Sequence, residues 1–314
     1  MLKKKRYLVP FIALIGALLT VLILTAAYPT IDRSLSQALT SGGAVTYTIG
    51  NIIEIWAEPI ALLPMCFVIA ACAVCFFRMK EKILHKIAAF ALFAAGAVLS
   101  EQVIYRVSKY YCKLTDITKP WTVRPGPFLS DNLWFKAVCT AAGVCMFALL
   151  VFLSSKIKQQ TLKKLLRVFI FVVITLAAEL IIIEAMKSVF GRIRYREWIN
   201  TNLEFLPWYR VNGKPASDAF KSFPSGHTAN ALLILPITFV FDALGKVKTG
   251  RALRIVHLCW MIVVMTSRIM AGAHYLSDVC GGAMISLTIV AVTGGIIFRD
   301  GKWSKEEPEK QPAA

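Results

Sequence analysis

Two of the four histidines lie in polar clusters that border long apolar runs. The first cluster reads SRIMAGAHYLSD over residues 267–278 and contains Arg268, His274 and Asp278. If a helix continues through this segment, His274 and Asp278 are four residues apart and share one face. A carboxylate there accepts a hydrogen bond from one imidazole nitrogen, which leaves the other nitrogen free as a nucleophile or base. Arg268 can offer its planar fork to a phosphate, so the cluster predicts chemistry on an anionic group.

The second cluster is the short sequence PSGH over residues 224–227, immediately before an apolar run. Ser225 and Gly226 suit the entry turn of a helix, whose free N–H groups bind anions. Gly226 also lets the backbone approach a ligand closely. His227 then lies beside a bound anion, where it can protonate a leaving oxygen. The same residues also suit an ordinary helix N-cap.

A third cluster is basic and lies at the end of another apolar run. Lys187 and Arg194 are seven residues apart, about two helical turns, and can project to one side. Arg192 and Arg196 add further positive charge. Long basic side chains that reach toward lipid headgroups at a helix end are the alternative explanation.

The composition identifies the environment in which these clusters must work. Of the 314 residues, 57% are hydrophobic and 17% are charged, which is too apolar for a single water-soluble core. The net charge of +18 comes from short basic clusters between long apolar runs, a pattern typical of membrane proteins rather than of nucleic-acid-binding proteins. We therefore expect an integral membrane protein without a nucleic-acid partner.

The apolar runs predict an all-α bundle of about eight membrane spans, since each run approaches the length that a transmembrane helix needs. The first run also resembles a signal peptide, but its length favours a membrane anchor. The run at 228–244 is the weakest because it is short and contains Pro236. The predicted spans are residues 8–27, 57–77, 87–105, 135–153, 168–186, 228–244, 254–273 and 279–298.

Basic residues in short loops predict the orientation of the bundle. They gather at the N-terminus and in alternate loops, which places both termini in the cytoplasm. Residues 299–314 are expected to form a disordered cytoplasmic tail. The loops 28–56, 106–134 and 187–227 and the turn at 274–278 then face outside. Two of these outer loops are basic, which indicates either an anionic substrate or an error in this topology.

The predicted topology brings all three clusters to one membrane face. Together they supply two histidines, cations, a carboxylate and a helix N-terminus to one anionic group. This set of groups is suited to phosphoryl transfer through a covalent histidine intermediate. Two intramembrane carboxylates lie nearby. Glu184 is expected to pair with Lys187, and Glu179 is either a protonated or helix-bridging group or a substrate contact.

Through the residues of these three clusters, the chain resembles the type 2 phosphatidic acid phosphatase (PAP2) superfamily. The family pattern is K-x6-R-P, then P-S-G-H, then S-R-x5-H-x3-D. The sequence matches it in order, except that Tyr195 replaces the proline after Arg194. The resemblance covers residues 168–298 and leaves residues 1–167, with about four spans, as an N-terminal membrane region that can shape lipid access.

The resemblance implies a role for each matching residue. His274 attacks phosphorus, Asp278 orients it, and His227 protonates the leaving group and then activates water. The phosphate oxygens are held by Lys187, Arg194, Ser225, Gly226 and Arg268. The resemblance implies no metal and no other cofactor.

The sequence therefore predicts a membrane lipid-phosphate phosphatase with its active site at the extracytoplasmic face of the cell membrane. Undecaprenyl diphosphate, phosphatidate and phosphatidylglycerophosphate are the expected classes of lipid substrate. Two alternatives are a lipid phosphotransferase that uses the same site and a transporter or scaffold with a catalytically dead site.

Overall fold

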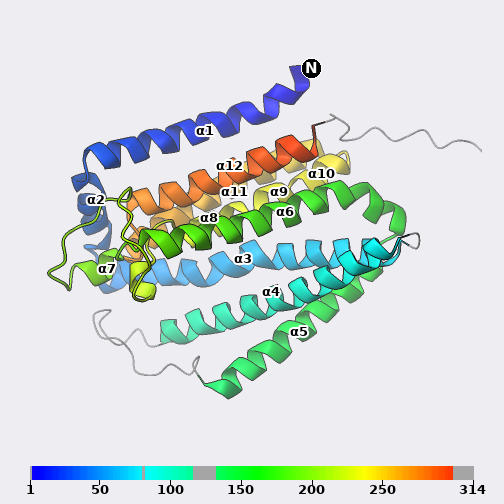
Figure 1. The fold of residues 1–314 in the computed structure, drawn as a ribbon, viewed down its shortest axis with the longest axis horizontal. Helices are drawn as coiled ribbons and strands as arrows, with labels where there is room; N and C mark the ends of the chain where they lie inside the picture. The colour runs from blue at the N-terminus through cyan, green and yellow to red at the C-terminus, as the bar shows by residue number, and fades with distance from the viewer. Residues whose placement is uncertain (1, 80–81, 116–131, 300–314) are drawn as a thin grey trace, which may run out of the picture.

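The computed structural model describes residues 2–79, 82–115 and 132–299 (Figure 1). All regular secondary structure in these residues is helical. Eight segments are long and apolar enough to cross a membrane, in agreement with the predicted all-α multi-pass bundle. They are Pro10–Ala27, Ala44–Phe77, Ile83–Tyr111, Leu133–Ser155, Gln159–Trp198, Gly226–Ala243, Val247–Met270 and Leu276–Ile297.

The helices that form these segments have the following bounds: α1 (Leu2–Ala27), α3 (Ala44–Phe77), α4 (Ile83–Thr115), α5 (Leu133–Ser155), α6 (Gln159–Phe190), α8 (Gly226–Leu232), α9 (Ile234–Ile237), α10 (Phe239–Ala243), α11 (Val247–Met270) and α12 (Leu276–Ile297). Helix α7 (Tyr195–Trp198) forms the end of the Gln159–Trp198 segment. Two shorter helices lie between segments: α2 (Thr30–Thr40) and the 3-10 helix η2 (Asp218–Phe220). Residues 300–314, the expected tail, lie outside the described residues.

The prediction that residues 28–56 form an outer loop is wrong. This segment contains α2 and the first turns of α3, which begins at Ala44 rather than near residue 57. The reason is that the residues before position 57 are largely apolar and can continue the helix. Helix α2 is amphipathic instead and buries Asp32 and Ser36.

The next predicted loop, residues 106–134, is also partly helical. Helix α4 continues ten residues beyond its predicted end at 105 and stops at Thr115. Residues 116–131 lie outside the described part of the chain. Residues 106–115 contain neither proline nor glycine, so the sequence has no strong helix breaker in this stretch.

The sixth span is a chain of three short helices, α8, α9 and α10, in the interior of the bundle. Pro236 lies inside α9 and has no backbone N–H to donate to the helical ladder. Thr238 follows it and donates its hydroxyl to the Leu235 carbonyl oxygen at 2.6 Å. Leu232, Leu233 and Leu235 are fully buried, so this span is enclosed by other helices rather than by lipid.

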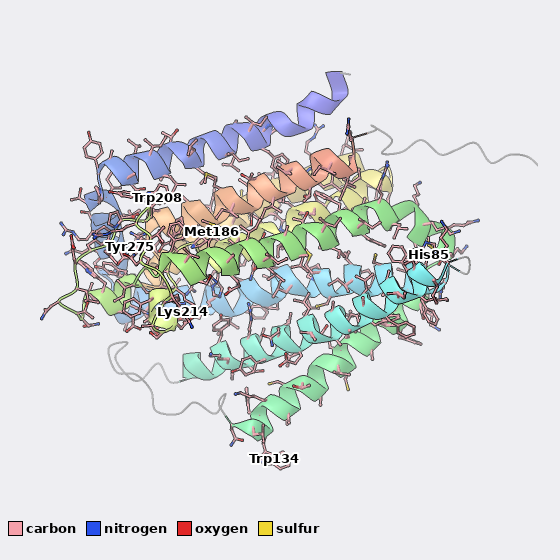
Figure 2. All side chains as sticks on the ribbon, viewed as in Figure 1. His85, Trp134, Met186, Trp208, Lys214 and Tyr275 are labelled. Carbon is pink, nitrogen blue, oxygen red and sulfur yellow. The ribbon has the colours of Figure 1, made fainter. Side chains whose placement is uncertain are left out.

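Helix α3 connects the two halves of the chain (Figure 1). It contacts α4 and α5 on one side and α6, α8 and α11 on the other, and α1 packs along α12. The helix α2, the helix α7 and the loops near them gather at one end of the bundle. Figure 2 shows Tyr275 at this end and His85 at the opposite end, near the basic loop between α3 and α4. Helices α1, α2 and α3 therefore pack directly against helices that carry the three clusters.

Candidate active site

His274 lies in a short loop between two helices, not on a continuous helix. Helix α11 ends at Met270, Gly272 adopts a left-handed backbone with φ of 60°, and α12 begins at Leu276. The Tyr275 backbone N–H donates to Asp278 Oδ2 at 2.9 Å and so caps α12. This break turns the imidazole of His274 inward, where the residue is 3% exposed.

The hydrogen bond at His274 Nδ1 identifies the tautomer of the neutral imidazole. Nδ1 lies 2.7 Å from the Ser222 carbonyl oxygen. A carbonyl oxygen only accepts, so Nδ1 must carry a proton and donate it. The neutral ring therefore has its lone pair on Nε2, the nitrogen available for nucleophilic attack.

Asp278 lies beside His274 as expected, but the two side chains are further apart than in an ordinary hydrogen bond. Asp278 Oδ2 lies 3.7 Å from His274 Nδ1, which is an ion-pair distance. The carboxylate instead accepts from the Ser222 hydroxyl at 2.5 Å. The helix break explains the difference, because Asp278 uses its side chain to cap the new helix. Ser222 is thus the residue that connects Asp278 to the imidazole.

Burial and nearby charge determine the protonation of His274. Loss of solvent lowers its pKa to about 4, and the positive charges of Arg194 and Arg268 act in the same direction, against the opposing effect of Asp278. The imidazole is therefore neutral at pH 7, as a nucleophile requires.

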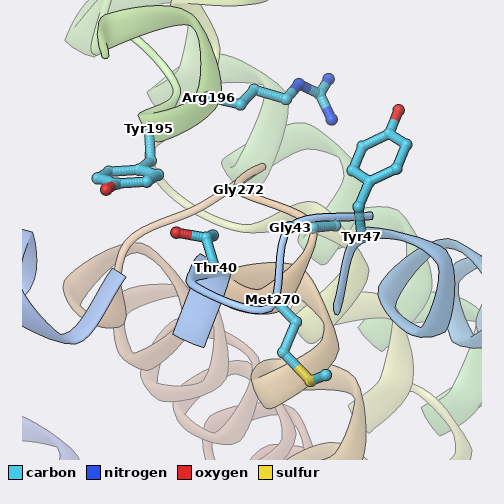
Figure 3. A pocket seen from close by; sticks show the side chains of 8 residues that line it. Thr40, Gly43, Tyr47, Tyr195, Arg196, Met270 and Gly272 are labelled. Carbon is cyan, nitrogen blue, oxygen red and sulfur yellow. The ribbon is translucent and has the colours of Figure 1, made fainter. Parts of the chain in front are cut away.

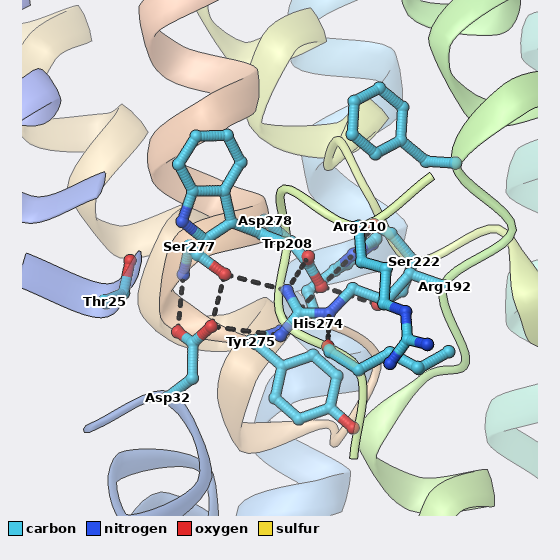
Figure 4. Close-up of polar contacts among 12 residues, drawn as sticks. Thr25, Asp32, Arg192, Trp208, Arg210, Ser222, His274, Tyr275, Ser277 and Asp278 are labelled. Atoms are coloured by element: carbon cyan, nitrogen blue, oxygen red, sulfur yellow. Dashed lines mark hydrogen bonds and ion pairs between the residues drawn. The ribbon is translucent and has the colours of Figure 1, made fainter. Parts of the chain in front are cut away.

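Asp278 also belongs to a buried ion-pair network (Figure 4). Arg192 is 1% exposed, and its Nη1 lies 2.6 Å from Asp278 Oδ1 while its Nη2 lies 3.0 Å from Asp32 Oδ2. Ser277 contributes its hydroxyl at 2.7 Å from Arg192 Nη1 and donates its backbone N–H to Asp32 at 2.8 Å. Asp278 is therefore held as an anion beside the imidazole.

The second cluster forms the entry to α8 as expected. Ser225 is the N-cap and accepts from the Thr228 hydroxyl at 3.1 Å, and its backbone N–H donates to the Asp278 carbonyl oxygen at 2.9 Å. A Cβ atom placed on Gly226 would lie 2.8 Å from Lys187 Nζ, so a side chain here would displace the lysine ammonium. The second and third clusters thus meet at Gly226, and the bond from Ser225 to Asp278 joins them to the first.

Two of the predicted phosphate-binding cations lie in ion pairs near this turn. Lys187 pairs with Glu184 at 3.0 Å, which confirms the expected i,i+3 contact. Arg194 Nη2 lies 3.0 Å from Asp218 Oδ2, and Asp218 is exposed. Each of these cations therefore has a weakly held, solvent-exposed partner that an incoming anion can replace.

The arginines also carry buried donors that point to an anion site. Arg268 Nη2 lies 3.1 Å from Glu54 Oε1. Among the described residues, several buried nitrogens have no hydrogen-bond partner: Nε of Arg194, and Nε and Nη1 of Arg268. Buried donors are nearly always satisfied in proteins, so these nitrogens are available to a bound anion.

His227 projects from the first turn of α8 toward residues of α3 and α4. Its Nε2 lies 3.1 Å from the Tyr110 hydroxyl and 3.4 Å from Glu54 Oε1. Glu54 therefore connects His227 to Arg268. Contacts or direct electrostatic interactions thus link all eight predicted site residues at one end of the bundle.

Residues 168–301 match the family model of the PAP2 superfamily. These residues form a PAP2 superfamily domain. No curated protein and no solved structure matches the chain. The PAP2 domain contains all eight predicted site residues.

Tyr195, which stands where the PAP2 pattern has proline, is buried and packs edge-on against Tyr275 with ring centroids 5.8 Å apart. The local loop therefore has an aromatic anchor in place of the proline. Arg196, the next residue, donates its backbone N–H to the Gly272 carbonyl oxygen at 2.9 Å. Figure 3 shows the small pocket beside them, which is lined by Thr40, Gly43, Tyr47, Tyr195, Arg196, Met270, Ala271 and Gly272.

The residues that support the PAP2 motifs were not predicted from the sequence. Arg192 was recognised only as added charge, and Ser222 had no assigned role. Three further residues lie outside the PAP2 domain: Asp32 on α2, Glu54 on α3 and Tyr110 on α4. The available signal was the presence of acidic residues in otherwise apolar segments. Acidic side chains are costly to bury unless they are paired.

Glu179 is a helix-bridging group, one of the two roles that the sequence left open. It is buried on α6 and accepts a hydrogen bond from the Ser286 hydroxyl on α12. One turn earlier on α6, the hydroxyls of Thr175 and Thr293 lie 2.9 Å apart and join the same two helices. Polar contacts thus fix α6 against α12 below the site.

The close approach of α12 to the Ser225 turn predicts a strong effect of adding one methyl group. A Cβ atom on Gly282 would overlap the Ser225 carbonyl oxygen, and backbone cannot easily move. We expect Gly282→Ala to lower the free energy of unfolding by about 1–3 kcal/mol. Gly295→Ala is the matched control on the same helix, since nothing lies within 4 Å of its Cβ. Denaturant unfolding in detergent measures both, and equal stability of the two variants would contradict this packing.

The lowered pKa of His274 predicts a pH-dependent stability. Between its ordinary value of 6.5 and about 4, the unfolded chain binds a proton that the folded chain does not. Acidification from pH 7 to pH 5 therefore lowers the free energy of unfolding by about 2 kcal/mol through this group. We expect His274→Gln to lose less stability over this pH interval than the wild type. An identical slope for both proteins would show that His274 is not buried as a neutral group.

Proposed function

We propose that the chain is a membrane lipid-phosphate phosphatase that works through a phosphohistidine at His274. The observation that carries this proposal is the combination of a buried imidazole, whose Nδ1 is held by Ser222, with buried arginine donors that lack partners among the described residues. A nucleophile beside an anion site is the arrangement that phosphoryl transfer requires.

In the proposed first step, His274 Nε2 attacks phosphorus and a P–N bond forms. The P–O bond to the leaving lipid alcohol or lipid phosphate breaks, and the leaving oxygen takes a proton from His227, which enters this step in its protonated form. The imidazole retains its Nδ1 proton and becomes positively charged. The Ser222 carbonyl oxygen at 2.7 Å and the Asp278 carboxylate at 3.7 Å both stabilise that charge.

In the second step, His227 accepts a proton from water, and the resulting hydroxide attacks phosphorus. The P–N bond breaks, inorganic phosphate leaves, and His274 returns to its neutral form. Throughout both steps, the phosphate oxygens are proposed to contact Lys187, Arg194, Ser225, the Gly226 backbone and Arg268. The reaction as proposed uses protein groups alone, as is typical of the PAP2 family.

The proposed substrate is a phosphorylated membrane lipid, of the undecaprenyl diphosphate, phosphatidate or phosphatidylglycerophosphate class. The location of the site supports this class, because it lies at one end of the helical bundle, where a headgroup can bind while its tail stays among the spans. We further propose that this end faces outside and that both termini are cytoplasmic. The basic loop near His85, at the opposite end of the bundle, supports that orientation.

The nucleophile is tested by replacing His274 with alanine. We expect purified wild-type protein in detergent, with a chelator present, to release inorganic phosphate from at least one lipid mono- or diphosphate. We expect His274→Ala to release it at least ~10³-fold more slowly, because no covalent intermediate can form. His257→Ala on α11 is the matched control and should retain activity.

Three results would contradict the proposal. Full activity of His274→Ala would show that another residue is the nucleophile. Transfer of the phosphate to a second lipid, without release, would identify a phosphotransferase. The absence of any reaction on all lipids would favour a transporter or scaffold.

A further inference from the structure

Glu54 is a buried carboxylate that comes from outside the PAP2 domain and lies inside its site. It belongs to α3 and is 4% exposed. A single oxygen, Oε1, lies 3.1 Å from Arg268 Nη2 and 3.4 Å from His227 Nε2. One anion therefore contacts both the arginine proposed to bind phosphate and the histidine proposed to protonate the leaving group.

Tight packing keeps Glu54 in this position. One turn earlier on α3, a Cβ on Gly50 would lie 2.7 Å from the Ser267 carbonyl oxygen, so α3 and α11 are in close contact here. One turn later, Ala57 packs against Ala231 and Val264. The backbone on both sides of this carboxylate is thus fixed against the helices that carry the arginine and the histidine.

The contacts of Arg268 show how a phosphate would meet this carboxylate. Nη2 faces Glu54, while Nε and Nη1 are buried without a hydrogen-bond partner among the described residues. A phosphate that accepts a hydrogen bond from Nε–H would lie next to Glu54, because Nε–H and Nη2 project from the same edge of the guanidinium. Two negative groups at such a distance repel each other strongly where water is excluded.

We propose that Glu54 is a resident counter-anion of the phosphate site. It neutralises Arg268 and contacts His227 while the site is empty, and it weakens the binding of any phosphate group that enters. A site with several cations and no carboxylate would retain its product, and Glu54 favours the release of that product. The inference rests on the proposed function only in placing a phosphate group at Arg268.

Binding of inorganic phosphate tests this role without any lipid. Glu54→Gln keeps the size of the side chain and removes its charge, so we expect the variant to bind phosphate about 10-fold more tightly than the wild type by calorimetry in detergent. Glu54→Asp withdraws the carboxylate by one methylene and should tighten binding by about 3-fold. Glu204→Gln is the control for net charge, because Glu204 is exposed and pairs weakly with Arg210 at 3.9 Å.

A second arm uses a phosphonate analogue of a lipid monophosphate, which cannot be hydrolysed, and distinguishes a lipid headgroup from free phosphate. Tighter binding in either arm supports the proposal, and the arm in which it occurs identifies the anion that Glu54 opposes. Unchanged or weaker binding by both Glu54 variants, with a wild type that binds phosphate, would overturn the counter-anion role alone. Failure of every protein to bind either anion would overturn the proposed phosphate site as well. A merely structural role would weaken binding, which is the opposite of the expected result.

Discussion

The site depends on the buried guanidinium of Arg192 between two carboxylates. Its Nη1 pairs with the Asp278 carboxylate, and its Nη2 pairs with the Asp32 carboxylate. All three residues are almost fully buried. Charges at this depth are stable only when they are paired and hydrogen-bonded. Asp278 can therefore remain an anion next to His274, and the loop that carries the imidazole is tied to α2 at the other end of the network.

Residues from outside the PAP2 domain also contact the residues of its site. Asp32 supports Arg192 from α2, while Glu54 and Tyr110 reach His227 from α3 and α4. The N-terminal helices thus contribute side chains to the site in addition to membrane spans. Helices α1, α2 and α3 also pack against the helices of the PAP2 domain.

Much of the fold could be predicted from the sequence, and so could the PAP2 motifs, but few of the supporting contacts could. Apolar runs predicted eight spans because burial in a membrane requires long apolar helices, and the motif spacing predicted the eight site residues. The bond from His274 to Ser222 was missed because it joins residues 52 positions apart. Asp32 was missed because its partner Arg192 is 160 residues away, and Glu54 is further still from its own partners. No local pattern encodes such pairs.

Residues outside the PAP2 domain hold in place the loop that carries His274. A substitution at Asp32 tests this dependence most directly. Asp32→Asn should lower the free energy of unfolding in detergent by about 3 kcal/mol, because Arg192 loses one of its two buried counter-charges. Asp218→Asn, which changes an exposed partner of Arg194, should cost less than about 1 kcal/mol. Equal effects of the two substitutions would contradict the dependence of the site on α2.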